Sequence, residues 1–433
     1  MSSVWESLSH RNFRLLASGQ LVSALGDGVA LVAVSFALLE STGSISTLGW
    51  VLGARYGCLG TFLLLGGVWG DRASRCRILV MSDLSRALAQ GTLAAVLLLG
   101  DAPFWALIAL QAGYGTAEAF FSPAIRGLIP HTVDRQHLRA ANAVGEVTFN
   151  AARVIGPALG GLLVIAIGTG GAIALDAVSF VVSAALVSRM RVVSPAPAPR
   201  SSVRVELAEG WSVVLRHRWL WSSIVTFTIF GALTIPAAWV LGPATSWRGL
   251  GGVAGWSALT SAFGAGALVG SFVALQLNAR RPGLVLMAAL MVAALRPATF
   301  VSGWPLPVIA AYCFIAGAAM AVAGVIWYTL LQSMLPSSML SRVSAIDDFG
   351  TYLLTPLGYF GAAPFAAAVG LSPALVLLAV IPAAVCLAAM AVPELRRLDG
   401  AVRPADNLRR DAAAGPVRRT PVVDHELERV LSG

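Results

Sequence analysis

The feature that most constrains this chain is a series of long apolar runs at nearly regular spacing. Each run is about as long as the 20 residues that an α-helix needs to cross a bilayer core. The runs fall at 13–38, 47–69, 78–99, 104–127, 141–167, 171–190, 220–242, 254–277, 283–302, 306–332, 342–368 and 373–393. Because lipid offers no hydrogen-bond partners, the backbone of each run must satisfy itself as a helix. The sequence predicts an all-α integral membrane protein with twelve transmembrane helices.

The composition supports this class and excludes several kinds of enzyme. Hydrophobic residues make up 57% of the 433 residues and charged ones only 12%, against roughly a quarter charged in soluble domains. All 30 basic residues are arginine, so the chain has no lysine for a phosphate-binding loop or a pyridoxal Schiff base. An ATP-driven pump on this chain is therefore excluded. The 4 cysteines lack metal-ligand spacing, and we expect no enzyme activity, cofactor or metal.

The distribution of arginine predicts how the chain lies in the membrane. If the N-terminus is cytoplasmic, 17 arginines outside the C-terminal tail fall in inner segments, and only Arg248 falls in an outer loop. Cytoplasmic loops carry such an excess. We therefore expect a multi-pass protein of the inner (plasma) membrane with both termini cytoplasmic. Since the arginines are spread over short loops despite the net charge of +9, no nucleic-acid partner is expected.

A polar stretch divides the apolar runs into two sets of six. It opens with three prolines and continues as an amphipathic segment expected to lie along the inner membrane surface. The expected organisation is an N-terminal six-helix bundle (1–191), a cytoplasmic linker (192–219), a C-terminal six-helix bundle (220–393) and a disordered cytoplasmic tail (394–433).

A weak internal repeat indicates that the two bundles are related. Leu128-Ile129-Pro130 and Met334-Leu335-Pro336 each precede a run that carries an acid near its start and a proline near its middle. Internal repeats of this kind are typical of secondary transporters. We therefore expect the two bundles to be pseudo-symmetric.

Ionisable residues inside the apolar runs are few and expensive in lipid, so each is a candidate functional residue. They are Asp27, Arg55, Arg86, Glu118, Glu146, Arg153, Asp176, Arg296, Asp347 and Asp348. Counting 1.5 Å per residue places Asp27 and Arg55 at the same depth, which predicts an ion pair near the midplane. Such a pair either takes part in transport or only sets the helix register. Arg86, Asp176 and the acids of run 342–368 lie nearer the interfaces and are expected to be structural.

Polar residues recur at helical spacing within several runs and so share one face of each helix. Such faces look onto protein or a water-filled cavity rather than lipid. We therefore assign Gln111 and Asn150, together with the intramembrane charge of Arg296 and the aromatic Trp327, to a substrate cavity. Aromatic residues such as Trp327 suit an apolar or aromatic compound, although packing explains each of them singly.

The loop from Gly67 to Arg77 resembles the G-x-L-x-D-R-x-G-R-R/K signature of the major facilitator superfamily. It keeps Gly67, Asp71, Arg72 and Arg75. It departs from the signature at Trp69, Ser74 and Cys76. The resemblance implies that these residues form a cytoplasmic gate that latches the two halves, whereas the loop alone also fits a tight turn with topology-setting arginines.

Run 141–167 carries Gly156-Pro157-Ala158-Leu159-Gly160-Gly161, which resembles the G-P-x-x-G-G core of the family's antiporter motif. Ala152 stands where that motif has a further glycine. The resemblance implies efflux rather than uptake. Gly160 and Gly161 also permit close helix approach, and Pro157 permits a bend, so ordinary packing is an alternative explanation.

Further stretches at 12–15, 119–124 and 392–397 resemble the bacterial exporter branch that includes enterobactin-exporter-like and macrolide-efflux-like members. The resemblance covers residues 8–397. It implies a monomeric secondary transporter that exports a drug, antibiotic or siderophore, with protons and the bilayer as its other partners. Uptake of a nutrient or metabolite, or a non-transporting membrane sensor, remains an alternative.

Proton coupling requires a carboxyl group that moves between apolar and aqueous surroundings. The candidates are Glu118, Asp27 and Glu146, with Arg55 or Arg153 holding the deprotonated form. Many drug/proton antiporters of the superfamily carry an arginine four residues before a glycine in the fourth helix. Here Ala109 and Gln111 occupy those positions, so coupling would have to proceed without that arginine.

Overall fold

The structure is a computed structural model that describes residues 6, 9–70, 74–100, 103–134, 137–192, 211–277, 279–335 and 337–398. Every regular element in these ranges is helical. Seven of the described helices are long and apolar enough, by length and composition, to cross a membrane. This agrees with the all-α membrane fold that the sequence predicts, while the count of twelve passes stays a prediction.

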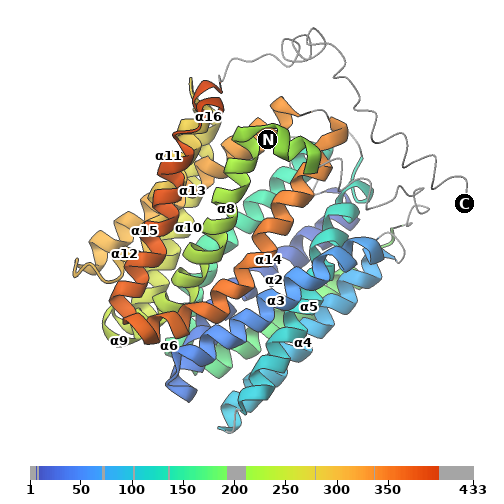
Figure 1. Cartoon of the computed structure of the whole chain (residues 1–433). Coiled ribbons are helices and arrows are strands. Elements are labelled where there is room, and N and C mark those ends of the chain that lie inside the picture. The colour runs from blue at the N-terminus through green and yellow to red at the C-terminus, as the bar shows by residue number, and fades with distance from the viewer. Residues whose placement is uncertain are drawn as a thin grey trace, which may run out of the picture.

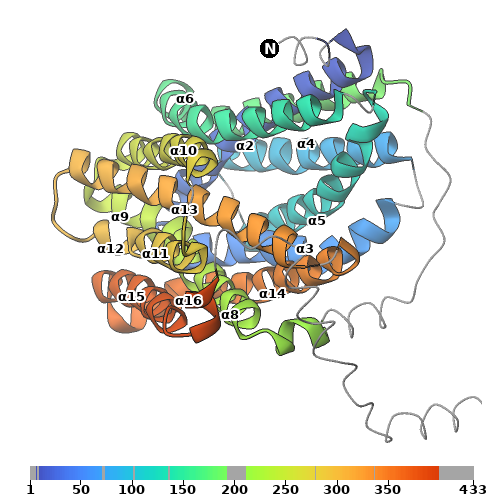
Figure 2. The same cartoon turned by 90° about the horizontal axis from the view of Figure 1, so that it is seen from above.

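The N-terminal helices pack around one another as an antiparallel group (Figure 2). They are α2 (Arg11–Thr42), α3 (Ile45–Gly70), α4 (Arg75–Leu99), α5 (Phe104–Leu128), the short η1 (Ile129–His131) and α6 (Leu138–Ser188). α2 packs along α6, α3 along α5, and α4 against both α5 and α6. The backbone of α6 leaves helical geometry at Gly168, which separates the two apolar runs predicted at 141–167 and 171–190.

The C-terminal helices form a second group (Figure 1). They are α8 (Arg218–Pro236), the π-helical η3 (Ala237–Leu241), α9 (Gly242–Gly249), α10 (Gly252–Gln276), α11 (Pro282–Ala294), α12 (Arg296–Thr299), α13 (Leu306–Met334), α14 (Ser337–Val369), α15 (Leu371–Ala389) and α16 (Pro393–Arg397). α10 packs along α13, α8 along α14, and α11 against α13 and α15.

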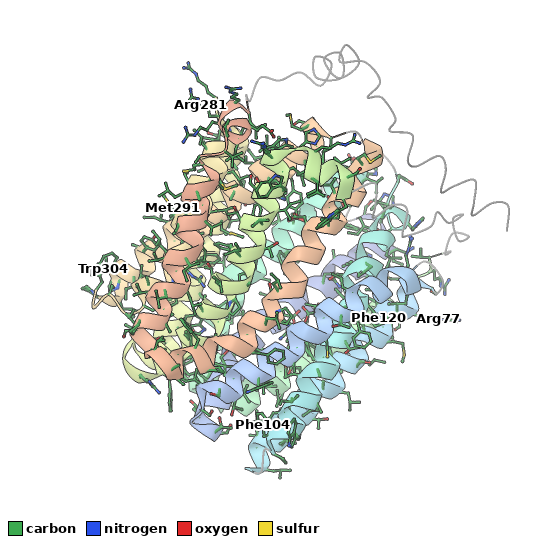
Figure 3. The ribbon with its side chains drawn as sticks, viewed as in Figure 1. Arg77, Phe104, Phe120, Arg281, Met291 and Trp304 are labelled. Atoms are coloured by element: carbon green, nitrogen blue, oxygen red, sulfur yellow. The ribbon has the colours of Figure 1, made fainter. Side chains whose placement is uncertain are left out.

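The two ends of the molecule differ in their turns. All described glycines with positive φ lie in turns at one end, namely Gly43, Gly100, Gly168, Gly251, Gly252, Gly303 and Gly370. Glycine adopts these angles without a Cβ clash, which allows tight reversals. We call this the glycine-turn end; Phe104 and Trp304 lie there, whereas Arg77 and Arg281 lie at the opposite, arginine-rich end (Figure 3).

Among the residues that the structure describes, the two groups of helices share a hydrophobic core only near the glycine-turn end. There one buried cluster joins Leu39 and Leu48 of the first group to Trp256 and Ala363 of the second. Contacts between α3 and α14 and between α6 and α10 hold this side together. Near the arginine-rich end, each buried cluster in the described residues belongs to one group only. The structure is therefore sealed by apolar packing at one end.

Several predictions fall on residues that the structure does not describe. These are Asp71 and Arg72 of the proposed gate, linker residues 193–210 and the tail beyond 398. Residues 211–216, at the end of the predicted linker, are helical. The four domain boundaries stay predictions.

The orientation of the arginine-rich end is open to direct test. Alkaline phosphatase folds only outside the cytoplasm, so a fusion after Arg218, at the start of α8, should be inactive. A matched fusion after Gly251, in a glycine turn, should be active because positive loops stay inside. Activities measured in intact cells at equal fusion abundance decide the matter. High activity after Arg218 would reverse the predicted topology.

Candidate functional site

A cavity of about 310 Å³ lies between the two groups of helices. This volume is in the lower range of small-molecule sites. Its charged lining residues are Asp27, Arg55, Arg86, Glu118, Arg153 and Arg296, and its aromatic ones are Tyr56, Phe121, Phe149, Trp239 and Phe263. The cavity is therefore walled by rings and by more arginines than acids.

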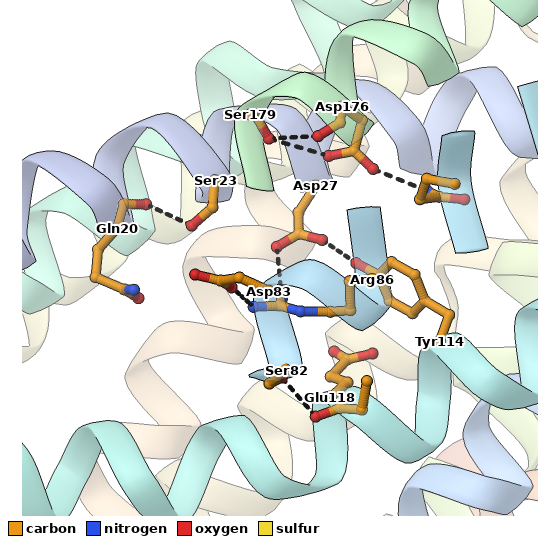
Figure 4. Close-up of polar contacts among 12 residues, drawn as sticks. Gln20, Ser23, Asp27, Ser82, Asp83, Arg86, Tyr114, Glu118, Asp176 and Ser179 are labelled. Carbon is orange, nitrogen blue, oxygen red and sulfur yellow. Dashed lines mark hydrogen bonds and ion pairs between the residues drawn. The ribbon is translucent and has the colours of Figure 1, made fainter. Parts of the chain in front are cut away.

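One side of the cavity is built around Arg86 on α4. Its guanidinium donates to Asp83, one helical turn earlier, and lies 3.8 Å from the carboxylate of Asp27 on α2 (Figure 4). Asp27 also accepts a hydrogen bond from the hydroxyl of Tyr114 on α5. Arg86 and Asp83 are 2% and 0% exposed. The Arg86 guanidinium is 4.2 Å from the ring centre of Phe121, so both its charge and its flat face are partnered.

A second pair lies beside the first. Arg55 on α3 donates through Nε and Nη2 to one carboxylate oxygen of Glu118 on α5, at 3.2 and 3.1 Å. The two helices approach so closely here that a Cβ on Gly115 would lie only 2.0 Å from the carbonyl oxygen of Arg55. The approach is possible because glycine has no Cβ. Gly115, one turn before Glu118, therefore sets the position of the pair.

The predicted Asp27–Arg55 ion pair is wrong. The structure pairs Arg55 with Glu118 and Asp27 with Arg86. Residue counting along a helix gives depth but not the direction in which a side chain points, and all four residues line the same cavity. The expectation that Arg86 lies near the membrane interface is also wrong, because Arg86 lines the cavity.

Three of the four residues assigned to the cavity do not line it. Gln111 is fully buried and donates to Gln90, which in turn donates to Asp176, at 3.1 and 2.8 Å. Trp327 donates through its indole nitrogen to Asp347 at 2.8 Å, away from the cavity. Asn150 is likewise absent from the lining. A row of polar residues on one helix face can thus also contact polar residues of the same helix group. Helical periodicity does not distinguish this case from a row that faces a cavity.

The fourth residue, Arg296, does line the cavity and begins α12 where the apolar helix α11 is interrupted. Arg153, from α6, lines it as well. Neither has a carboxylate within ion-pair distance in the described part of the chain. Glu146, the remaining coupling candidate, is exposed and lies outside the cavity lining.

The glycine motif of α6 makes two close helix contacts. A Cβ on Gly156 would lie 2.7 Å from the Cα of Gly28 on α2, and one on Gly160 would lie 3.0 Å from the Cα of Val29. Gly161 faces the other way, against Ser257 on α10. Pro157 lines the cavity, while the backbone break in α6 lies at Gly168 rather than at Pro157.

Of the proposed gate, only part is described. Gly67 lies within the last turn of α3, and Arg75 begins α4. Arg75 donates from Nη1 to the carbonyl oxygen of Gly127 at 2.5 Å. This contact ties α4 to the end of α5 within the N-terminal group; the role of a latch between groups stays a prediction.

Two residues of the site, Tyr114 and Asp83, were not predicted from the sequence. Tyr114 lies at helical spacing between Gln111 and Glu118, so it shares the polar face of that helix and could have been predicted from it. Asp83 lies three positions before Arg86 in one apolar run, a spacing that places these opposite charges on one helix face. Both signals were available from the sequence.

Comparison with known proteins identifies the family to which this chain belongs. The model of the Major Facilitator Superfamily matches residues 16–359. The multidrug efflux pump Tap of Mycolicibacterium fortuitum is 28% identical over 405 residues, which cover 90% of this chain and 98% of the pump. The enterobactin exporter EntS of Escherichia coli O1:K1 is 26% identical over 364 residues, covering 81% and 86%.

Solved structures show the same fold at low identity. A bacterial homologue of the human lysosomal transporter Spinster, in an inward-facing and unoccupied conformation, has a TM-score of 0.68 and 15% identity, covering 89% of this chain and 97% of its own. The nucleoside transporter NupG has a TM-score of 0.68 and 12% identity, covering 90% and 100%. The family match, the helical fold and these neighbours agree with the resemblance seen in the sequence, and the chain belongs to the Major Facilitator Superfamily of membrane transporters.

Proposed function

We propose that this protein is a secondary active exporter of a small organic molecule and that it works by proton antiport. The observation that carries the proposal is a central cavity lined by paired carboxyl and guanidinium groups, between helix groups joined by a core at one end only. The similarity to proteins named as a multidrug efflux pump and an enterobactin exporter supports the direction of transport.

The difference in packing between the two ends of the molecule provides a scheme for alternating access. With the arginine-rich end in the cytoplasm, the sealed glycine-turn end faces outward, and substrate enters the cavity from inside. Rocking of the two groups then exchanges which end is sealed. In this scheme Gly67, Asp71, Arg72 and Arg75 form the latch on the cytoplasmic side, as the signature loop implies.

The charges of the N-terminal group provide a means of proton coupling. Four buried or cavity-lining carboxyl groups, Asp27, Asp83, Glu118 and Asp176, surround only two arginines, Arg55 and Arg86. Excess charge of one sign is costly in a low-dielectric interior, and each proton bound by a carboxyl group lowers this excess of negative charge by one. Asp27 and Glu118 line the cavity, so these two are placed to exchange protons with its water.

Coupling is tested with purified protein in proteoliposomes and three probes of equal skeleton: naphthalene-2-sulfonate, naphthalene-2-sulfonamide and a 2-naphthyl trimethylammonium ion. Wild type should move at least one probe faster when a pH gradient is imposed. Glu118→Gln and Asp27→Asn remove the titrating group, so we expect each to reduce this gradient-driven component about tenfold or more. Glu40→Gln is the matched control, since Glu40 is exposed at the end of α2 and lies outside the cavity lining, and should behave as wild type.

Each other outcome decides against part of the proposal. If both cavity variants retain wild-type dependence on the gradient, these acids do not carry protons. Probe movement in the same direction as the protons would indicate uptake. If none of the three probes is moved at any gradient, the exporter assignment fails.

A further inference from the structure

We propose that the exported molecule carries an anionic group and that Arg153 and Arg296 hold this group between them. The inference rests on the proposed export function and names the chemical class of its substrate: an organic acid whose carboxylate, sulfonate or phosphate sits on a body with aromatic or apolar surface.

The first observation is that the cavity's arginines fall into two kinds. Arg55 has Glu118 and Arg86 has Asp83 and Asp27 as counter-ions. Arg153 and Arg296 have no ion pair and donate no side-chain hydrogen bond among the described residues, and each is held only against aromatic rings. Two positive charges in the cavity wall therefore have no carboxylate within ion-pair distance among the described residues, and Glu146 acts on Arg153 only from beyond that distance.

The second observation is how Arg296 is held. It is only 5% exposed, and its guanidinium lies 4.3 Å from the ring centre of Phe263 and 5.8 Å from that of Phe300. A ring face attracts the charge but accepts none of the five N–H groups in the way an oxygen does. Burying an unpaired charge is expensive, so a counter-ion from outside the chain would gain more here than at an exposed arginine.

The third observation brings the two arginines to one place. The backbone of Arg153 packs against Gly264 on α10, where a Cβ would lie 2.5 Å from the Arg153 carbonyl oxygen. The residue before Gly264 on α10 is Phe263, and the guanidinium of Arg296 lies over its ring. Both side chains line the same cavity, and like charges that face one cavity repel each other. An anion between them would relieve this repulsion and accept hydrogen bonds from both.

The surroundings indicate what the rest of the substrate is like. Phe149, Phe263 and Trp239 line the same cavity, which suits an aromatic or apolar body. Gln20 also lines it, and its side-chain nitrogen is a buried donor without a partner. Unused donors and positive charge together favour a ligand rich in acceptor oxygens.

The position of the two arginines gives the anion a role in transport. Arg153 belongs to the N-terminal helices and Arg296 to the C-terminal ones. A group that both arginines bind ties the two sets of helices together. Binding would therefore favour the conformation in which the two sets enclose the substrate, as coupling of substrate to alternating access requires.

Binding of the same three naphthalene probes to purified protein in neutral micelles tests the inference, with equilibrium dialysis against empty micelles as the blank. Wild type should bind the sulfonate at least about tenfold more tightly than the sulfonamide or the ammonium ion, because charge-assisted hydrogen bonds are stronger than neutral ones. Arg153→Gln and Arg296→Gln should each reduce the preference about tenfold, and the double variant should show none. Arg153→Lys should retain most of it.

Arg248→Gln removes the same charge from an exposed site at the glycine-turn end and should bind like wild type. Arg153 is exposed to the cavity, so its variants test the inference even if the buried Arg296 cannot be replaced without unfolding. Equal binding of all three probes by wild type, or an unchanged preference in Arg153→Gln, would overturn it. Because dialysis needs no transport, anion binding without export would instead remove the proposed function.

Discussion

Replacing Arg86 by glutamine should destabilise the protein severely, with about 3–5 kcal/mol lost from the free energy of unfolding. Asp83 is fully buried and would lose the guanidinium that donates to its carboxylate, and Asp27 would lose its nearest guanidinium as well. Removing one member of a buried ion pair leaves an uncompensated charge, which is the costly event. The measurement is thermal unfolding in detergent micelles, followed by tryptophan fluorescence, together with the yield of monodisperse protein.

The matched control is Arg77→Gln, which removes the same charge from an exposed position on the same helix and should change stability little. A second variant, Asp83→Asn combined with Arg86→Gln, removes both charges and should recover part of the loss. If Arg86→Gln and Arg77→Gln unfold at the same temperature, the pairing around Arg86 does not stabilise the fold.

Replacing Gly156 by alanine should separate α2 from α6 and abolish most transport activity. The added Cβ would lie 2.7 Å from the Cα of Gly28, and a backbone atom in a packed helix cannot rotate away as a flexible side chain does. Overpacking of this kind costs about 1–3 kcal/mol, sometimes more. Gly28→Ala meets the same contact from the other side, so it should have the same effect. Melting temperature and probe transport at equal protein amount measure both.

Gly145→Ala is the control within the same helix. A Cβ there meets nothing within 4 Å, and alanine is the better helix former by about 0.5–1 kcal/mol. The two substitutions are chemically identical, yet we expect opposite signs: a lower melting temperature for Gly156→Ala and an unchanged or higher one for Gly145→Ala. Equal behaviour would mean that the α2–α6 crossing tolerates separation and that the glycine does not set it.

The helical class and the approximate extent of most helices were predictable from the sequence because the bilayer imposes a length and a hydrophobicity on every crossing. The helix from Leu306 to Met334, for example, matches the apolar run at 306–332. The interruption at Arg296 and the π-helical turn at 237–241 were not predicted, because the hydrophobicity of an apolar run is the same whether or not its helix is broken. The family resemblance rested on short motifs and was confirmed.

The contacts of the site were decided by the tertiary structure. Helical periodicity indicates that Glu118 and Arg153 face something other than lipid, and the charge of Asp27 indicates the same for Asp27, but neither signal shows what these residues face. Which carboxylate meets which guanidinium depends on the rotation of each helix about its axis and on how near its neighbours come. Those two quantities are set by contacts far apart in the chain, such as Gly115 against Arg55 and Gly156 against Gly28. The sequence therefore determined which charges enter the membrane, whereas packing determined their pairing and left Arg153 and Arg296 without an ion pair among the described residues.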